Sequence, residues 1–262
     1  MPATSPPTFQ PVTVATYNIH RTLGSDGRCS PGRIADVILG LDAHLVALQE
    51  VETPAKPAHR ALLRQLEDAG YETLLGPTIR AASHHYGNAL LTQLPVLACT
   101  RLDLSVPNRE PRGLIDARLD LALLHHGPPD SAPAPELRCL ATHLGLSGAE
   151  RRAQIARIVE RIDGPGDGTT PGPPLVLLGD FNEWWPRRLR PFSSRLRFAP
   201  VRVTWPSRSP LLALDRIFYR NLRLQASVTD RSPLSRLASD HLPLRAQFRI
   251  PDAATSSRAR SS

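Results

Sequence analysis

The stretch that most constrains this chain is LVLLGDFNEWW, at residues 175–185. Its apolar start, closed by Gly179, fits a strand buried on both faces, and the DFNE that follows is mostly acid and amide. Asp180 and Asn182 are two residues apart, so at a strand end they point the same way and can meet one metal-bound or phosphate oxygen. A strand that ends in Asp-x-Asn fits a simple turn equally well, because both residues bond readily to their own backbone. This motif alone therefore leaves a turn and a functional site open.

Other strand-like runs of the chain also end in polar residues. These residues are Asn18 after VTVATY, Glu50 after HLVALQ, His143 in LRCLATH, and Asp215, Asp240 and His241 in the pair LDRIFY and SDHLPL. Carboxylate, amide and imidazole groups gathered at strand ends can together form a site for a metal ion and a phosphate.

These motifs resemble the endonuclease/exonuclease/phosphatase superfamily, which includes DNase I-like nucleases, abasic-site endonucleases, inositol polyphosphate 5-phosphatases and neutral sphingomyelinases. The resemblance runs from about residue 13 to residue 248, with every motif in the family's order, and GDFN and SDH are its most specific elements. It implies an α/β fold, a four-layer α/β/β/α sandwich of two mixed β-sheets flanked by helices, with the site at one end. Periodicity alone predicts only an α+β or α/β protein with two sheets.

The resemblance implies a divalent cation, Mg²⁺ with Mn²⁺ as the alternative. Glu50 is the implied carboxylate ligand, which suits Mg²⁺ because this ion prefers one or two carboxylates together with water and phosphate oxygens. Asn18 matches the asparagine that orients the metal shell or the phosphate. Asp240 is expected to be a second carboxylate on the metal side. Taken singly, Glu50 also fits a solvated strand end and Asn18 a turn.

The resemblance also implies catalytic roles. His241 is the expected general base, and Asp215 is expected to fix its tautomer and raise its basicity; such a pair can titrate near neutrality. Asp180 and Asn182 match the residues that position the water or hold the phosphate and metal, and His143 matches a histidine that donates to a phosphate oxygen. Without the family, His143 fits a core histidine, and the SDH motif fits a helix cap or turn.

Four residues are candidates for substrate binding. Tyr86 and Asn88, in YGNALL, resemble a family segment that lines the cleft, and Arg112 can clamp a phosphate through two parallel hydrogen bonds. Trp184 and Trp185 precede the basic run RRLRPFSSRLR, a combination that suits either stacking on nucleic-acid bases or contact with lipid headgroups. Core packing of one of these tryptophans is the simpler alternative.

Composition sets the class of protein. With 262 residues, 41% of them hydrophobic, and no unbroken apolar run near the ~18 residues of a membrane span, we expect a soluble protein with one domain at 12–251. Residues 1–11 and 252–262 are expected to be disordered. The N-terminus lacks a basic and then apolar leader, which predicts a cytoplasmic protein. Three cysteines without metal-ligand spacing predict reduced thiols.

The formal net charge of +8 suits a phosphate-bearing or polyanionic partner. Because Lys56 is the sole lysine, the arginine bias fits genome composition equally well. The sequence predicts a metal-dependent phosphoesterase that hydrolyses phosphodiester or phosphomonoester bonds by in-line attack of water, with a nuclease ahead of the other classes. The alternatives are a phosphoesterase for phospholipid headgroups or inositol phosphates, and a non-catalytic relative that binds phosphate or nucleic acid.

Overall fold

The computed structural model describes residues 8–53, 57–81, 84–126, 135–164 and 172–251. Most of its strands form two six-stranded mixed sheets. The first sheet runs in the order β13 (Arg223–Thr229), β14 (Leu244–Arg249), β2 (Val12–Asn18), β3 (Leu45–Thr53), β5 (His85–Thr92) and β4 (Glu72–Arg80). The second sheet runs in the order β11 (Arg197–Phe198), β12 (Asp215–Arg220), β10 (Leu175–Asp180), β9 (Glu136–His143), β7 (Gly113–Asp120) and β6 (Val96–Asp103).

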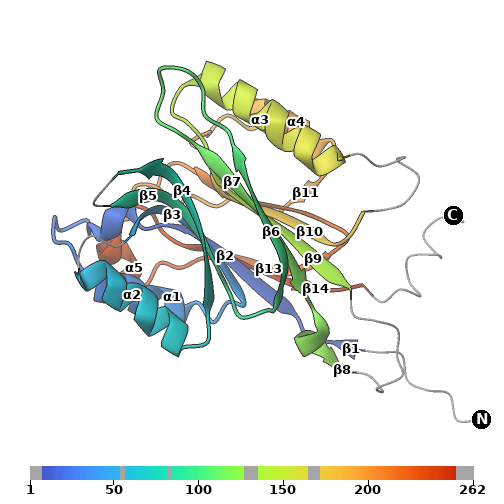
Figure 1. The fold of residues 1–262 in the computed structure, drawn as a ribbon, viewed down its shortest axis with the longest axis horizontal. Helices are drawn as coiled ribbons and strands as arrows, with labels where there is room; N and C mark the ends of the chain where they lie inside the picture. The colour runs from blue at the N-terminus through green and yellow to red at the C-terminus, as the bar shows by residue number, and fades with distance from the viewer. Residues whose placement is uncertain (1–7, 54–56, 82–83, 127–134, 165–171, 252–262) are drawn as a thin grey trace, which may run out of the picture.

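Helices cover the outer faces of both sheets (Figure 1). On one side lie α1 (Pro31–Gly40), α2 (Pro57–Asp68) and α5 (Pro233–Ala238). On the opposite side lie α3 (Gly148–Asp163) and α4 (Arg190–Ser193). Short 3-10 helices span His20–Thr22, Ala122–Leu124 and Pro186–Leu189.

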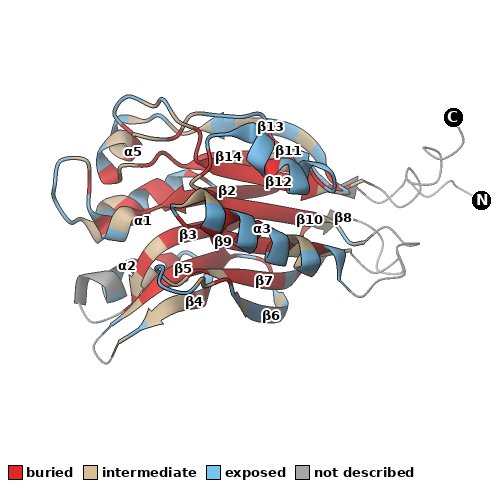
Figure 2. Cartoon of the chain, turned by 90° about the horizontal axis from the view of Figure 1, so that it is seen from above, coloured by how far each residue is buried: buried red, intermediate tan, exposed pale blue. Residues whose placement is uncertain are grey.

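Three hydrophobic clusters fill the spaces between these layers. The cluster between the sheets contains residues of both, such as Leu45 and Leu178. A second cluster packs α1 against the first sheet, and a third packs α3 and α4 against the second sheet around Phe181 and Phe218. Strands buried on both faces lie between outer helices that are partly exposed (Figure 2). The expected four-layer sandwich is therefore confirmed.

Each sheet holds one parallel pair of strands. These pairs are β2–β3, joined through α1, and β9–β10, joined through α3. Both connecting helices begin at a sequence signal for a helix start, Ser30-Pro31 for α1 and the capping-box sequence SGAE at residues 147–150 for α3. Ser30 caps α1 by accepting the Arg33 N–H ahead of Pro31, and Ser147 forms a capping box with Glu150 at the start of α3.

Three local expectations need correction. Thr8–Phe9 is strand β1, which pairs with β8 (His125–His126), so disorder does not extend to residue 11; the edge of β8 supplies backbone partners that the Pro-rich sequence does not reveal. The run GLIDARLDLALL at residues 113–124 predicts one strand, but the strand ends at Asp120 and a 3-10 helix follows at Ala122–Leu124. Helix α5 was not predicted at all.

Two further expectations concern the chain as a whole. Cys29, Cys99 and Cys139 are free thiols, as predicted. Within the described ranges we find no helix with the length and apolar character needed to cross a membrane. The expected tail at 252–262 lies outside the described residues.

Candidate active site

Strand ends from the second sheet bring three of the predicted groups together. β9 ends at His143, β10 ends at Asp180 and β12 begins at Asp215. In the ladder Asp180 lies between the other two, opposite His143 on one side and Asp215 on the other. All three side chains are buried. The strand register of the second sheet therefore places these three side chains next to one another.

Gly179 explains how β10 approaches β9 so closely at this point. Its φ is 153°, and a Cβ there would lie 1.9 Å from the backbone oxygen of Thr142. Any other residue would push the two strands apart just before Asp180. The glycine of the GDFN motif is thus required by backbone contact.

Asn18 connects the two sheets. Its Nδ2 donates to Glu50 Oε1 and to Asp180 Oδ2, both at 3.1 Å. Two carboxylates from different sheets therefore face one point at the end of the sandwich. Asn18 is itself held by Ser239, whose hydroxyl donates to the Asn18 carbonyl at 2.8 Å.

Glu50 reaches this point through an irregular backbone. Its φ is 60°, and the pairing of β3 with β5 shifts between Leu48 and Val51. A β-bulge re-aims a side chain, and a non-glycine residue at positive φ costs about 1–3 kcal/mol that the surrounding structure must offset. The bulge frees Glu50 from strand alternation and turns it toward Asn18.

His241 forms the pair that the sequence predicts. Its Nδ1 lies 2.9 Å from Asp215 Oδ2, and its Nε2 lies 3.7 Å from Asp180 Oδ2. Because Asp215 accepts the proton of Nδ1, Nε2 is the nitrogen that faces the site. Burial lowers the pKa of His241, but the carboxylates of Asp215 and Asp180 outweigh it and raise the pKa to about 10. This value lies well above the near-neutral titration expected for a single His–Asp pair, since a second carboxylate acts on the ring.

His143 has the opposite electrostatic environment. Arg112 NH1 lies 3.1 Å from His143 Nδ1, and because a guanidinium only donates, the ring proton belongs on Nε2. Nε2 lies 3.5 Å from Asp180 Oδ2 and 3.0 Å from Asn182 Nδ2. Burial lowers the pKa of His143 to about 3; Asp180 opposes this shift, and the charge of Arg112 adds to it. His143 is therefore neutral, with its ring proton on Nε2.

Asn182 forms a local turn and also lies within the candidate site, which are the two alternatives that the Asp-x-Asn motif left open. Its backbone N–H donates to Asp180 Oδ1 at 2.9 Å, and its φ is 49°, which is the local turn. Its side chain also donates to the Leu144 carbonyl at 2.9 Å, beside His143. This turn places the Asn182 side chain next to the His143 imidazole.

Asp240 lies at the rim rather than among the central carboxylates. Trp205 Nε1 donates to its Oδ2 at 3.2 Å, and His20 Nδ1 lies 3.6 Å from its Oδ1. The chain bends at Asp240 and His241, which lets these two neighbouring side chains face different groups. Sequence reasoning missed Trp205 and His20; the only signal for His20 is its place two residues after Asn18.

The predicted substrate-binding residues differ in position. Tyr86 is buried beside Glu50: burial first, and then the Glu50 charge, raises its pKa to about 12. Asn88 donates to the Gly113 carbonyl at 3.2 Å and so ties β5 to β7. Trp184 and Trp185 are 51% and 56% exposed, so the alternative of core packing for one of them is wrong. Their strand has already ended, and Phe181 fills the core instead.

Glu183 is a structural residue that the GDFN motif did not predict. It is fully buried, and its Oε2 accepts from Arg151 Nε at 3.0 Å. Arg151 also donates to the carbonyls of Gly145 and Leu146. This ion pair joins the loop after His143 to the loop that carries Asn182. An acidic residue directly after GDFN was its one sequence signal.

Comparison with known proteins identifies the family of this chain. The family model described as endonuclease/exonuclease/phosphatase matches residues 15–241. The chain belongs to this family. Members of the family generally hydrolyse phosphoester bonds and typically use a divalent metal.

Relatives of this endonuclease/exonuclease/phosphatase chain match it along most of their length. The Escherichia coli K12 protein YbhP is 31% identical and covers 90% of this chain and 96% of its own. The catalytic domain of human Nocturnin, solved with a bound sulfate, superposes with a TM-score of 0.69 at 20% identity, over 92% of this chain and 96% of that one. TDP2 of D. rerio, solved with a single-strand DNA product, has a TM-score of 0.67 at 15% identity, over 91% and 99% of the two chains. The two structures share the fold.

The residues present fit a divalent cation of the kind this family typically uses. Glu50 and Asp180 offer hard carboxylate oxygens that already converge on the Asn18 amide. Ligand atoms of Asp180, Asp215 and His241 also lie within 4.8 Å of one another. Glu50, Asp180 and Asn18 could hold such a cation, because Asp215 is engaged with the His241 ring.

Proposed function

We propose that this chain is a metal-dependent phosphoesterase that cleaves phosphodiester bonds in nucleic acid by in-line attack of water. The observation that carries the proposal is the position of Asp180 between a His–Asp pair and a neutral histidine. Such an arrangement offers a proton acceptor on one side of a phosphate and a hydrogen-bond donor on the other.

In this proposal His241 accepts the proton of the attacking water at Nε2 while Asp215 holds its Nδ1–H. His143 donates from Nε2 to a phosphate oxygen, and Arg112, which donates to Nδ1, keeps that ring in place. A divalent cation at the carboxylates would polarise the phosphate and, by its charge, oppose the protonation of His241. Glu50, Asp180 and Asn18 would hold it, with Asp240 at the rim.

Nucleic acid is the favoured substrate because the chain carries a formal net charge of +8 and shares its fold with TDP2, which was solved with a single-strand DNA product. A second candidate, a phospholipid headgroup, is favoured by the exposure of Trp184, Trp185 and Leu146 next to the site. Exposed aromatic residues can stack on bases or enter a lipid interface.

The test is Mg²⁺-dependent hydrolysis, with an EDTA control, of plasmid DNA, single-stranded RNA, an abasic-site duplex, inositol polyphosphates and sphingomyelin. We expect the wild type to cleave a nucleic acid, and His241→Ala to lose about 100–10,000-fold in kcat. His125→Ala, on β8 away from the site, is the matched control and should be unaffected. Cleavage of lipid alone would overturn the nuclease assignment. Absence of turnover together with absence of Mg²⁺ binding would favour a non-catalytic binding protein.

A further inference from the structure

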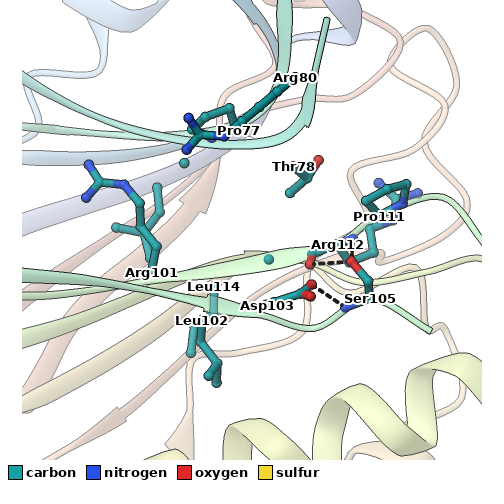
Figure 3. A pocket seen from close by; sticks show the side chains of 13 residues that line it. Pro77, Thr78, Arg80, Arg101, Leu102, Asp103, Ser105, Pro111, Arg112 and Leu114 are labelled. Carbon is teal, nitrogen blue, oxygen red and sulfur yellow. Dashed lines mark hydrogen bonds between the residues drawn. The ribbon is translucent and has the colours of Figure 1, made fainter. Parts of the chain in front are cut away.

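A second recess lies beside the candidate active site. It is a pocket of about 370 Å³ between the end of β4, the end of β6 and the start of β7. Figure 3 shows Arg80 and Pro77 of β4 on one side and Arg101 and Leu102 of β6 on the other, with Arg112 at one end. A recess of this size falls within the range of small-molecule sites, about 300–1,000 Å³, and so has room for more than a single phosphate.

Arg112 joins this pocket to the site. The same side chain that lines the pocket places NH1 3.1 Å from His143 Nδ1. The pairing of β7 with β9 sets this proximity, because Leu114 lies opposite Thr142 in the ladder. A substrate that has one phosphate at His143 can therefore extend directly into the pocket.

Three arginines give the pocket a positive charge. Arg80 and Arg101 form no ion pair with any carboxylate of the described ranges. Arg101 Nε donates to the Leu75 carbonyl, so the Arg101 side chain reaches from β6 to β4. Arg112 is only 6% exposed, and its Nε has no hydrogen-bond partner within the described part of the chain. A buried guanidinium that the protein satisfies incompletely favours an anionic ligand.

The acidic groups near the pocket do not cancel this charge. Asp103 lines the pocket, but its Oδ1 accepts the Ser105 N–H at 2.8 Å. Glu110 pairs with Arg112 from a position that is 43% exposed. Three guanidinium groups therefore face two carboxylates, and Thr78 adds a hydroxyl to the wall.

Glycines keep the pocket open at its base. A Cβ on Gly113 would lie 3.1 Å from Thr78 Cγ2, and one on Gly76 would lie 2.7 Å from Ile115 Cγ1. Side chains at these positions would fill the space where the two sheets approach. The remaining floor is apolar, formed by Leu102 and Leu114, which suits a sugar or base next to a phosphate.

We propose that this arginine pocket binds the phosphate that neighbours the scissile one in a nucleic-acid strand. The inference rests on the proposed function and narrows it, because it requires a substrate with at least two phosphates along one chain. A substrate with a single phosphodiester, such as a lone lipid headgroup, would leave Arg80 and Arg101 unused.

Binding tests the pocket without any need for turnover. A fluorescent tetranucleotide is titrated in EDTA, and its anisotropy is followed with wild type, with Arg80→Ser/Arg101→Ser and with Arg60→Ser/Arg64→Ser. The last variant is the matched control, since it removes the same charge from the exposed face of α2. We expect the pocket variant to lose about tenfold or more in affinity, and its salt dependence to weaken by about one ion per arginine lost. Equal losses in both variants would overturn the proposal.

Hydrolysis supplies the second arm. A dinucleotide with one phosphodiester is compared with the same dinucleotide carrying one additional terminal phosphate, at the 5′ end or at the 3′ end. We expect the wild type to prefer one phosphorylated form by about tenfold in kcat/KM, and Arg80→Ser/Arg101→Ser to lose that preference. No preference in the wild type would overturn the pocket assignment. Arginine-dependent binding without hydrolysis of any nucleic acid would instead overturn the proposed function and retain the pocket.

Discussion

The two parallel units, β2–α1–β3 and β9–α3–β10, share one geometry and supply different chemistry. Each lies in the middle of a six-stranded sheet and has antiparallel neighbours on both sides in the same arrangement. The first unit carries Asn18 at the end of β2 and Glu50 at the bulge of β3, and the second unit ends in His143 and Asp180. The backbone therefore fixes where functional groups stand, while the side chains decide that the first unit offers an amide and a carboxylate and the second offers a carboxylate and an imidazole.

The two units also differ in how their helices are attached. Helix α1 packs on its sheet through Ile34, Val37 and Ile38, all apolar. Helix α3 adds a buried polar network to its apolar stripe, centred on Arg151 and Glu183. This network lies directly behind the loops of His143 and Asn182. The second unit therefore has polar as well as apolar contacts behind the loops of His143 and Asn182.

The largest expected effect distinguishes the roles of two carboxylates, Glu50 of the first unit and Asp180 of the second. Partners that only orient a metal ligand are worth about 10–100-fold in metal affinity or activity, so we expect Glu50→Gln and Asp180→Asn each to lose at least about 100-fold in kcat/KM. Raising the Mg²⁺ concentration should restore Glu50→Gln more than Asp180→Asn, because Asp180 also faces both histidines. Metal titrations of activity measure this, with Glu72→Gln as an exposed control. Equal recovery of activity in the two variants would show that Glu50 and Asp180 do not differ in this way.

The next effect concerns the buried ion pair of the second unit. Arg151→Met leaves the Glu183 carboxylate with the half-exposed Arg188 as its ion-pair partner among the described residues and with the Trp185 N–H, so we expect a loss of about 3–5 kcal/mol in the free energy of unfolding. The double variant Arg151→Met/Glu183→Leu should recover most of it, and Arg152→Met on the exposed face should be neutral. Denaturant unfolding supplies the measurement. A single variant as stable as wild type would show that the network does not hold α3.

The smallest effect lies at the opposite end of the first unit. His44 Nδ1 accepts the Thr13 N–H at 3.1 Å, whereas in the second unit the Pro174 carbonyl accepts the Arg138 N–H at 2.9 Å. Burial lowers the pKa of His44 below its ordinary value of 6.5, so the stabilisation is complete above that pH and is lost as the pH falls through the folded pKa.

Replacing His44 with glutamine, which accepts a hydrogen bond but does not titrate, should abolish this dependence of stability on pH. Between about pH 7 and about pH 5, the melting temperature of wild type should therefore fall further than that of His44→Gln. Parallel melting curves of the two proteins record the difference. An identical decline in both would assign the pH dependence to other groups.

Much of this arrangement follows from local sequence. Apolar runs that end in Asn18, His143 and Asp180 predict strand ends, and the serine caps at Ser30 and Ser147 predict where both helices begin. These signals act within a few residues, so no knowledge of the fold is required. The expected family and sandwich follow from the same motifs and are confirmed.

What the sequence does not reveal depends on distant contacts. Nothing near Glu50 announces its positive φ, because the bulge arises from pairing with β5. The partner of Asp240 is Trp205, far along the chain, and the burial of Arg112 requires β7 to lie beside β9. Each of these features belongs to the assembled sheets rather than to any one segment.

The site draws on residues from Asn18 to His241, and Asn18 links the first sheet to Asp180 of the second. During synthesis from the N-terminus, Glu50 is made early and the His241–Asp215 pair late. A chain that is still attached to the ribosome therefore carries Glu50 before the His241–Asp215 pair exists. Assembly of the site is then a late event in the folding of this chain.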